Sequence, residues 1–168
     1  MSQASEEIVE AWLKEKGYFI MRNIRLKRNK EIDFLAIHLE GGCEPLRERC
    51  HIEVQASPYS RAISKPYWPP ESYADWLVRR KFEDDIVKAE VTKRLGNDYQ
   101  KVLVLGSYGR TKPSKEERNK LIKEIERRGV KVIKFEDVLN QVQKSLGTGT
   151  YAQPSLRILQ YFKFMKNW

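Results

Sequence analysis

The chain has 168 residues, a length that fits one domain with a full hydrophobic core. Its 32 lysines and arginines exceed its 23 aspartates and glutamates, and the formal net charge of +9 indicates either a polyanionic partner, with nucleic acid as the leading candidate, or a solvated basic surface. No apolar run is long enough to cross a membrane, the acidic N-terminus is unlike a secretory signal, and two cysteines make no disulfide framework, so we expect a cytoplasmic protein.

The first part of the chain predicts one helix, three strands and a loop. Apolar residues recur at helical spacing after Ser5, a suitable N-cap, and Gly17 is a suitable stop. Two of the apolar runs that follow each contain a carboxylate, and a stretch with four prolines is too proline-rich for a helix or central strand. The predicted elements are a helix over 5–16, strands over 18–26, 31–37 and 51–56, and an ordered loop over 57–72.

The second part alternates predicted helices and strands. Ser114 begins the pattern Ser-Lys-Glu-Glu, which predicts a capping box at the start of a helix. The whole order predicts a single α/β domain over residues 1–168, with a mixed sheet flanked by helices. The predicted elements are helices over 73–95, 114–128, 136–145 and 154–166, and strands over 101–106 and 130–135.

Asp33 and Glu53 are the most informative residues, because each lies inside a run that otherwise predicts a buried strand. Burying a carboxylate costs several kcal/mol unless it is paired or binds a cation. Side chains alternate across a strand, so a hairpin joining the two runs would place both acids on one surface, as in a site for a divalent metal. The alternative is two unrelated acids at frayed strand ends, each paired with a basic neighbour.

Four short motifs between Ser5 and Gln55 give the chain a family resemblance. They are Glu6 in "SEEIVEAWLKEKGY", then Arg22-Asn23-Ile24-Arg25, then Glu31-Ile32-Asp33 before an apolar run, then Glu53-Val54-Gln55. In this order they resemble the PD-(D/E)xK nuclease superfamily, particularly its Holliday-junction-resolvase-like branch. The family pattern has Glu-x-Lys at the last motif, and this chain has Gln55 in place of the lysine.

The resemblance implies a fold and an activity. It implies a restriction-endonuclease-like core of helix, three strands, helix and strand (αβββαβ), to which this chain adds one αβ unit and C-terminal helices. It implies a metal-dependent endonuclease acting on DNA, including branched or damaged DNA, and makes a homodimer plausible. The implied Mg²⁺ or Mn²⁺ ligands are Asp33, Glu53 and the Val54 carbonyl, with Glu6 as a further catalytic acid for which Glu7 and Glu10 compete.

Gln55 bears on whether the site is active. Glutamine is neutral and cannot act as a general base, although it can orient a water. Lys81 or Lys88, on the helix after the third strand, could supply the missing positive charge. The alternative is a catalytically inactive nucleic-acid-binding module on the same fold, and a third possibility is a protein whose partner is another protein in a repair or defence complex.

Basic and aromatic residues supply the expected DNA contacts. A run of four before Asp33 fits either a phosphate clamp or a charge-protected edge strand. The proline-rich loop fits either a packed connector or a substrate-contacting flap, in which Tyr59, Tyr67 or Trp68 would stack on bases or wedge a duplex. The predicted DNA-binding residues are Arg22, Arg25, Lys27, Arg28, Tyr59, Arg61 and Lys65.

The two histidines and two cysteines allow one further metal hypothesis. His38, Cys43, Cys50 and His51 could form a zinc site, but their spacing lacks the usual Cys-x₂-Cys pair. His51 shares the face of Glu53, where it could contact a phosphate or cap the start of the strand.

Overall fold

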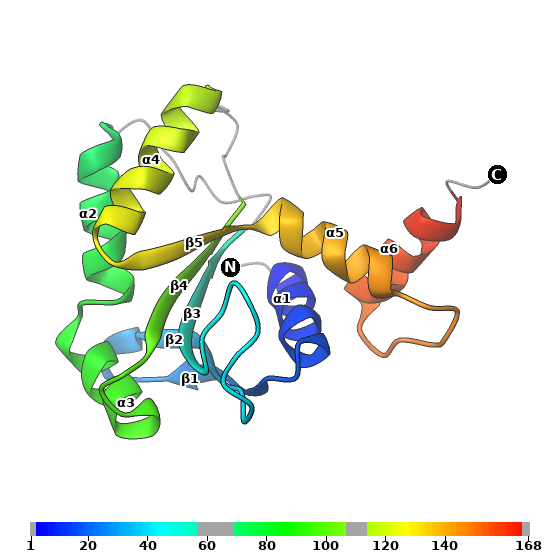
Figure 1. Ribbon diagram of the computed structural model, residues 1–168, viewed down its shortest axis with the longest axis horizontal. Coiled ribbons are helices and arrows are strands. Elements are labelled where there is room, and N and C mark those ends of the chain that lie inside the picture. Colours follow the sequence, from blue (N-terminus) through cyan, green and yellow to red (C-terminus); the bar gives the residue numbers. More distant parts are fainter. Residues whose placement is uncertain (1–2, 57–68, 107–113, 166–168) are drawn as a thin grey trace.

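The computed structural model describes residues 3–56, 69–106 and 114–165, and its centre is a five-stranded mixed sheet with helices on both sides (Figure 1). The strands lie in chain order across the sheet. The first three are antiparallel and the last two run parallel to the third, so the α/β class and the mixed sheet are as predicted. The strands are β1 (Phe19–Arg25), β2 (Glu31–Ile37), β3 (Arg49–Gln55), β4 (Gln100–Leu105) and β5 (Val130–Lys134).

The helices cover the two faces of the sheet in separate layers. One layer buries an apolar cluster that includes Phe34, Ile52 and Val104 under α1 (Gln3–Glu15), α5 (Phe135–Ser145) and the start of α6 (Pro154–Met165). The opposite face packs Leu103 and Leu105 against α2 (Pro70–Lys81) and α4 (Lys115–Arg127), and Leu35 against α3 (Asp85–Leu95). Figure 1 shows α2 and α4 on one side of the sheet and α1 and α5 on the other.

The predicted helix over 73–95 is wrong, because it is two helices. Asp84 interrupts it, since its carboxylate accepts hydrogen bonds from the backbone N–H groups of Ile86 and Val87 (3.1 and 3.4 Å) and so caps α3. Phe82, at the end of α2, is fully buried. The first of the two helices also begins three residues earlier than predicted, because Pro70 occupies its first turn, where no intrahelical N–H bond is lost.

The ends of the other helices follow local signals more closely. The capping box is present, with Ser114 Oγ accepting from the Glu117 N–H (3.1 Å) and the Glu117 carboxylate accepting from the Ser114 N–H (2.7 Å). Gly17 ends α1 in the left-handed conformation (φ +83°). Ser5 does not cap this helix, because α1 already begins at Gln3 and Ser5 is buried within it. No helix within the described ranges is both long and apolar enough to cross a membrane.

Candidate functional site

Asp33 and Glu53 lie together where the β2–β3 ladder ends. The last paired residues there are Phe34 and Ile52, so Asp33 and Glu53 are the next residues along each strand. Each carboxylate bonds to the backbone of the other strand: Asp33 Oδ2 accepts from the Val54 N–H (2.8 Å) and Glu53 Oε1 accepts from the Asp33 N–H (3.4 Å). The predicted hairpin and shared surface are therefore present, and both side chains are fully buried.

Two basic side chains complete this cluster. Lys81 Nζ, on the last turn of α2, donates to Glu53 Oε2 (2.7 Å) and lies 3.9 Å from Asp33 Oδ2. The fully buried ring of His51 bonds through Nε2 to Glu53 Oε1 (2.9 Å) and packs against the Phe82 ring, with centroids 4.9 Å apart. Lys88 does not share this position, because it lies on the separate helix α3 and pairs with Glu83 (3.2 Å).

One carboxylate oxygen of the pair has no hydrogen-bond partner in the described part of the chain. Three of the four oxygens of Asp33 and Glu53 accept hydrogen bonds, whereas Asp33 Oδ1 is buried without a hydrogen-bond partner among the described residues. Burial, followed by the charge of Glu53, raises the pKa of Asp33 to about 8. Asp33 Oδ1 is therefore the atom of the pair that most requires a proton or a cation.

Glu53 and Lys81 remain the charged members of the cluster. Burial acts to raise the pKa of Glu53, but its hydrogen bond from His51 and the charge of Lys81 outweigh burial and lower that pKa. Burial acts to lower the pKa of Lys81, and the two carboxylates outweigh it and raise that pKa. A buried ion pair with neighbouring Asp33 available for a proton is thus the favoured state without a metal.

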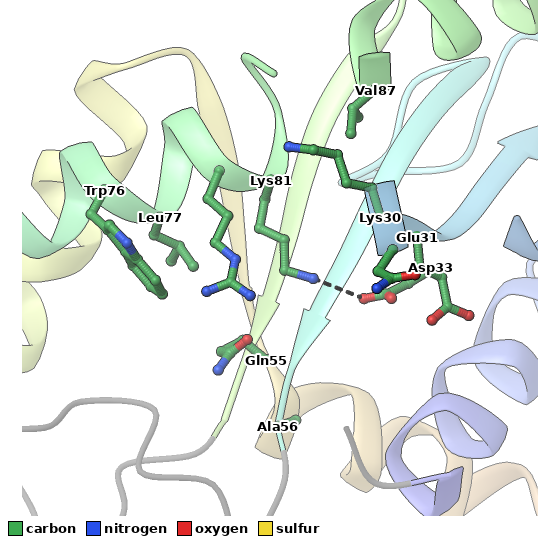
Figure 2. Close-up of a pocket in the computed structure, with 11 residues that line it drawn as sticks. Lys30, Glu31, Asp33, Gln55, Ala56, Trp76, Leu77, Lys81 and Val87 are labelled. Carbon is green, nitrogen blue, oxygen red and sulfur yellow. Dashed lines mark ion pairs between the residues drawn. The ribbon is translucent and has the colours of Figure 1, made fainter. Parts of the chain in front are cut away.

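A cavity of about 370 Å³ opens beside the cluster. Asp33 and Gln55 line it from the sheet, and Lys81 lines it from α2. Figure 2 shows Lys81 reaching from its helix toward Asp33, with Gln55 lower in the same opening. Arg80 and Lys30, which is ion-paired with Asp84, add two more cations to the lining and Glu31 adds one more acid. Cations therefore outnumber acids in the lining, which favours an anion next to the buried carboxylates.

The cluster suits a hard divalent cation better than zinc. Mg²⁺ commonly takes one or two protein carboxylates and completes its shell with water and substrate phosphates. Asp33 Oδ1 could bind such a cation without losing a partner, and Glu53 Oε2 could do so by releasing Lys81. Because the described residues contain no group of three or more His, Cys, Asp or Glu side chains placed to hold a metal, binding would depend on this pair, on water and on substrate.

The zinc hypothesis finds no support in the described residues. The Cys50 side chain packs in the α1 layer, whereas His51 faces the Glu53 side of the sheet. His38 Nδ1 is engaged by the backbone N–H groups of Glu40 and Gly42 (3.1 and 3.3 Å). The four side chains do not converge, and no metal-binding group is found among them.

The structure separates the three candidate glutamates of α1. Glu7 bonds to Ser155, and Glu10 forms ion pairs with Arg22 and Lys14, so both are engaged away from Asp33. Glu6 is buried, which raises its pKa, and its charge in turn raises the pKa of Asp33. Glu6 is therefore the candidate nearest to the pair in electrostatic terms, although it does not join the two carboxylates in a three-acid cluster.

The predicted DNA-binding residues have different surroundings. Arg22 pairs with Glu10, and its side chain is about a third exposed (36%). Arg25 and Lys27 are exposed beside a hollow of about 540 Å³ next to α3, and Arg28 is exposed in the turn after β1 with φ +59°. Tyr59, Arg61 and Lys65, with Tyr67 and Trp68, fall in residues 57–68, outside the described residues.

Sequence reasoning missed three residues at this site. His51 shares the face of Glu53, as the alternation along the strand predicts, and the bond of its ring to the Glu53 carboxylate is the part that the sequence did not indicate. Trp76 and Arg80 are not among the predicted site residues. Both line the cavity together with Lys81. Trp76 and Arg80 are four residues apart, so the sequence already places them on one face of a helix.

The role of the Val54 carbonyl as a third metal ligand stays a prediction. Val54 belongs to the site through its N–H, which donates to Asp33.

Comparisons of the chain with protein-family models, with curated proteins and with solved structures found no match. The geometry around Asp33, Glu53 and Lys81 is therefore the basis on which a function can be assigned.

Proposed function

We propose that this chain is a metal-dependent endonuclease that hydrolyses phosphodiester bonds in DNA. The observation that carries the proposal is the buried pair Asp33 and Glu53, with Lys81 between the carboxylates and a cavity lined by further cations beside them. A cation-lined cavity attracts a phosphate, and Asp33 in its lining, with Glu53 buried beside Asp33, can hold the divalent ion that phosphate hydrolysis commonly uses. The net charge of +9 supports a nucleic-acid substrate over a small phosphate ester.

Each residue has a distinct part in the proposed reaction. Asp33 and Glu53 would hold Mg²⁺ or Mn²⁺, which when bound lowers the pKa of a water and neutralises charge on the phosphate. Lys81 would move its ammonium group from Glu53 to a non-bridging phosphate oxygen, so that its charge acts where negative charge develops. Gln55, half-buried in the cavity wall, would orient the attacking water by hydrogen bonds.

We also propose a specific fold family for this chain. The order α1, β1, β2, β3, α2–α3, β4 supports a restriction-endonuclease-like core, with the middle helix broken at Asp84. The pair α4 and β5 then extends the sheet at its parallel edge. In this assignment Lys81 substitutes for the family lysine whose position Gln55 occupies, because its ammonium group lies beside both carboxylates.

The test is cleavage of matched linear duplex, single-stranded and four-way-junction DNA with Mg²⁺, with Mn²⁺ or with EDTA. Asp33→Asn and Glu53→Gln should abolish metal-dependent cleavage and keep DNA binding. Glu48→Gln is a matched control, because Glu48 is an exposed acid that pairs with Arg49 at the start of β3. Cleavage that survives Asp33→Asn, or that proceeds in EDTA, would remove the metal pair from the mechanism.

A catalytically inactive DNA-binding module is the second candidate. The observation favouring it is that both oxygens of Glu53 are already engaged, one by His51 and one by Lys81, so the ion pair could be a purely structural one. This candidate predicts salt-dependent DNA binding without cleavage under any metal. Gain of cleavage by Gln55→Lys in an otherwise inert protein would identify the chain as a degenerate nuclease.

A further inference from the structure

The side of α2 that faces the cavity contains a stack of flat groups close to the carboxylate pair. The Tyr73 and Trp76 rings stack with centroids 5.7 Å apart and planes inclined by 26°. The Arg80 guanidinium lies over the Trp76 ring, with Cζ 5.1 Å from the centroid. These residues follow helical spacing (i, i+3, i+7), and Tyr73 is fully buried, whereas Trp76 is half-buried and Arg80 is exposed.

Two members of this stack belong to the wall of the candidate active site. Trp76 and Arg80 line the same cavity as Asp33 and Lys81. Figure 2 shows Trp76 and Leu77 toward one end of the opening and Asp33 and Glu31 toward the other, with Lys81 between. Trp76 precedes Lys81 by five residues, so along the helix axis they are about 7.5 Å apart, on the order of one nucleotide of an extended strand.

This wall has the chemistry of a nucleobase-stacking site. Bases stack on aromatic rings and on the plane of an arginine guanidinium, and such stacking tolerates any base because every base has a π-face. An exposed guanidinium can shift on its flexible stem, so a base can stack on Arg80 or replace it over Trp76. Such contact requires an unpaired base, because a paired base inside a duplex is stacked on its neighbours.

We propose that Trp76 and Arg80 stack an unpaired nucleobase next to the phosphate held at Asp33 and Lys81, so that the substrate is a single strand or a duplex with an unpaired nucleotide at that phosphate. The inference rests on the proposed function and names its substrate class. A cavity of about 370 Å³ is at the small end of the range for ligand sites, which fits one nucleotide unit.

The test measures DNA binding in EDTA, so that it does not depend on cleavage. Fluorescence anisotropy would compare a labelled single-stranded oligonucleotide with its duplex for the native protein and for Trp76→Leu, Trp76→Phe and Arg79→Ala. Trp76→Leu should weaken single-strand binding about 5- to 100-fold and leave duplex binding unchanged, and Trp76→Phe should keep most of the affinity. Arg79→Ala is the matched control, because Arg79 is exposed on the same helix, pairs with Asp75 (3.0 Å) and lies outside the cavity lining.

A second measurement uses only the native protein, which removes any dependence on how the variants fold. Single abasic sites would be moved along the same oligonucleotide, and one position or two adjacent ones should weaken binding while the others do not. Equal loss of single-strand and duplex binding in Trp76→Leu, or an abasic series without a sensitive position, would overturn the inference. If the stacking inference fails and metal-dependent cleavage is still observed, the proposed function holds. If binding is sensitive to a missing base but no cleavage is observed, the stacking site holds and the proposed nuclease activity is refuted.

Discussion

Replacing Lys81 by methionine should destabilise the fold and strengthen its response to divalent metal ions. Methionine keeps much of the apolar stem and removes the ammonium group that lies 2.7 Å from Glu53 Oε2 and 3.9 Å from Asp33 Oδ2. Breaking a buried ion pair by removing one partner costs about 3–5 kcal/mol, because it leaves an uncompensated charge. The Lys81 side chain is 20% exposed, so we expect the low end of that range, about 3 kcal/mol.

Thermal unfolding in EDTA is the assay for this loss. In a chain of this size about 3 kcal/mol corresponds to a fall in Tm of about 6–12 °C. Lys88→Met is the matched control, because Lys88 pairs with Glu83 at the surface and such pairs contribute about 0–1 kcal/mol. An unchanged Tm in Lys81→Met would show that the buried pair does not need its ammonium partner.

Metal titration then tests whether Lys81 occupies the position of a cation. A ligand at about 100 times its Kd stabilises the native state by about 2.7 kcal/mol, so Mg²⁺ should restore most of the Tm lost by Lys81→Met. The native protein should respond less, since its own ammonium group competes for Glu53. A smaller rise in Tm with Mg²⁺ in Lys81→Met than in the native protein would refute this reasoning. If Lys81 acts on the phosphate, the rate of cleavage by the variant should also fall about 10²- to 10³-fold.

Substitutions at three positions, Asp33, His51 and Asn23, give the remaining predictions. Burial raises the pKa of Asp33 from 3.8 to about 8, so the native state holds a proton that the unfolded chain has released, and the stability contributed by Asp33 falls as the pH rises from about 4 to about 8. Asp33→Asn should remove this loss, so in urea unfolding in EDTA the variant should gain stability relative to the native protein as the pH rises, and it should be the more stable of the two above pH 8. His51→Leu should cost about 1–3 kcal/mol in urea unfolding, because Glu53 Oε1 loses a buried hydrogen-bond donor. His51→Gln can keep a donor and should cost less, and equal losses for the two variants would exclude His51 as a stabilising donor to Glu53. Asn23 lies in β1 in the left-handed conformation (φ +53°), so Asn23→Val should destabilise the fold by about 1–2 kcal/mol and Asn23→Gly should not. Equal melting temperatures for the two variants would contradict a left-handed conformation at this position.

Several features of the fold and site could be predicted because they depend on residues close together in the chain. Alternation with period two placed Asp33 and Glu53 on one face of their strands. Because a hairpin joins these two strands directly, the same pattern predicted that the two side chains lie close together. The capping box at Ser114 and the stop at Gly17 are contacts within one helical turn. Element order and sheet class follow from such local signals, because hydrophobic periodicity and turn residues act over a few positions.

The tertiary structure decided which of several equivalent side chains reach the site. Lys81 and Lys88 were equal candidates in the sequence, and the break capped by Asp84 leaves only Lys81 on the helix beside the carboxylates. Local propensity did not reveal this break, because an Asp within an apolar-periodic run is compatible with a continuous helix as well as with a new N-cap. Phe82, at the end of the first of these helices, packs against His51, a contact between residues 31 positions apart that no local pattern shows.

The charge state of the site also required the assembled structure. The sequence determined that Asp33 is an acid in an apolar strand, but its raised pKa depends on its burial in the packed structure and on the nearby charge of Glu53. The distinction between Glu6 and Glu10 likewise depended on Arg22, which crosses from β1 to pair with Glu10. Electrostatic energies vary with distance and with the local exclusion of water, and both are set only when distant segments pack together.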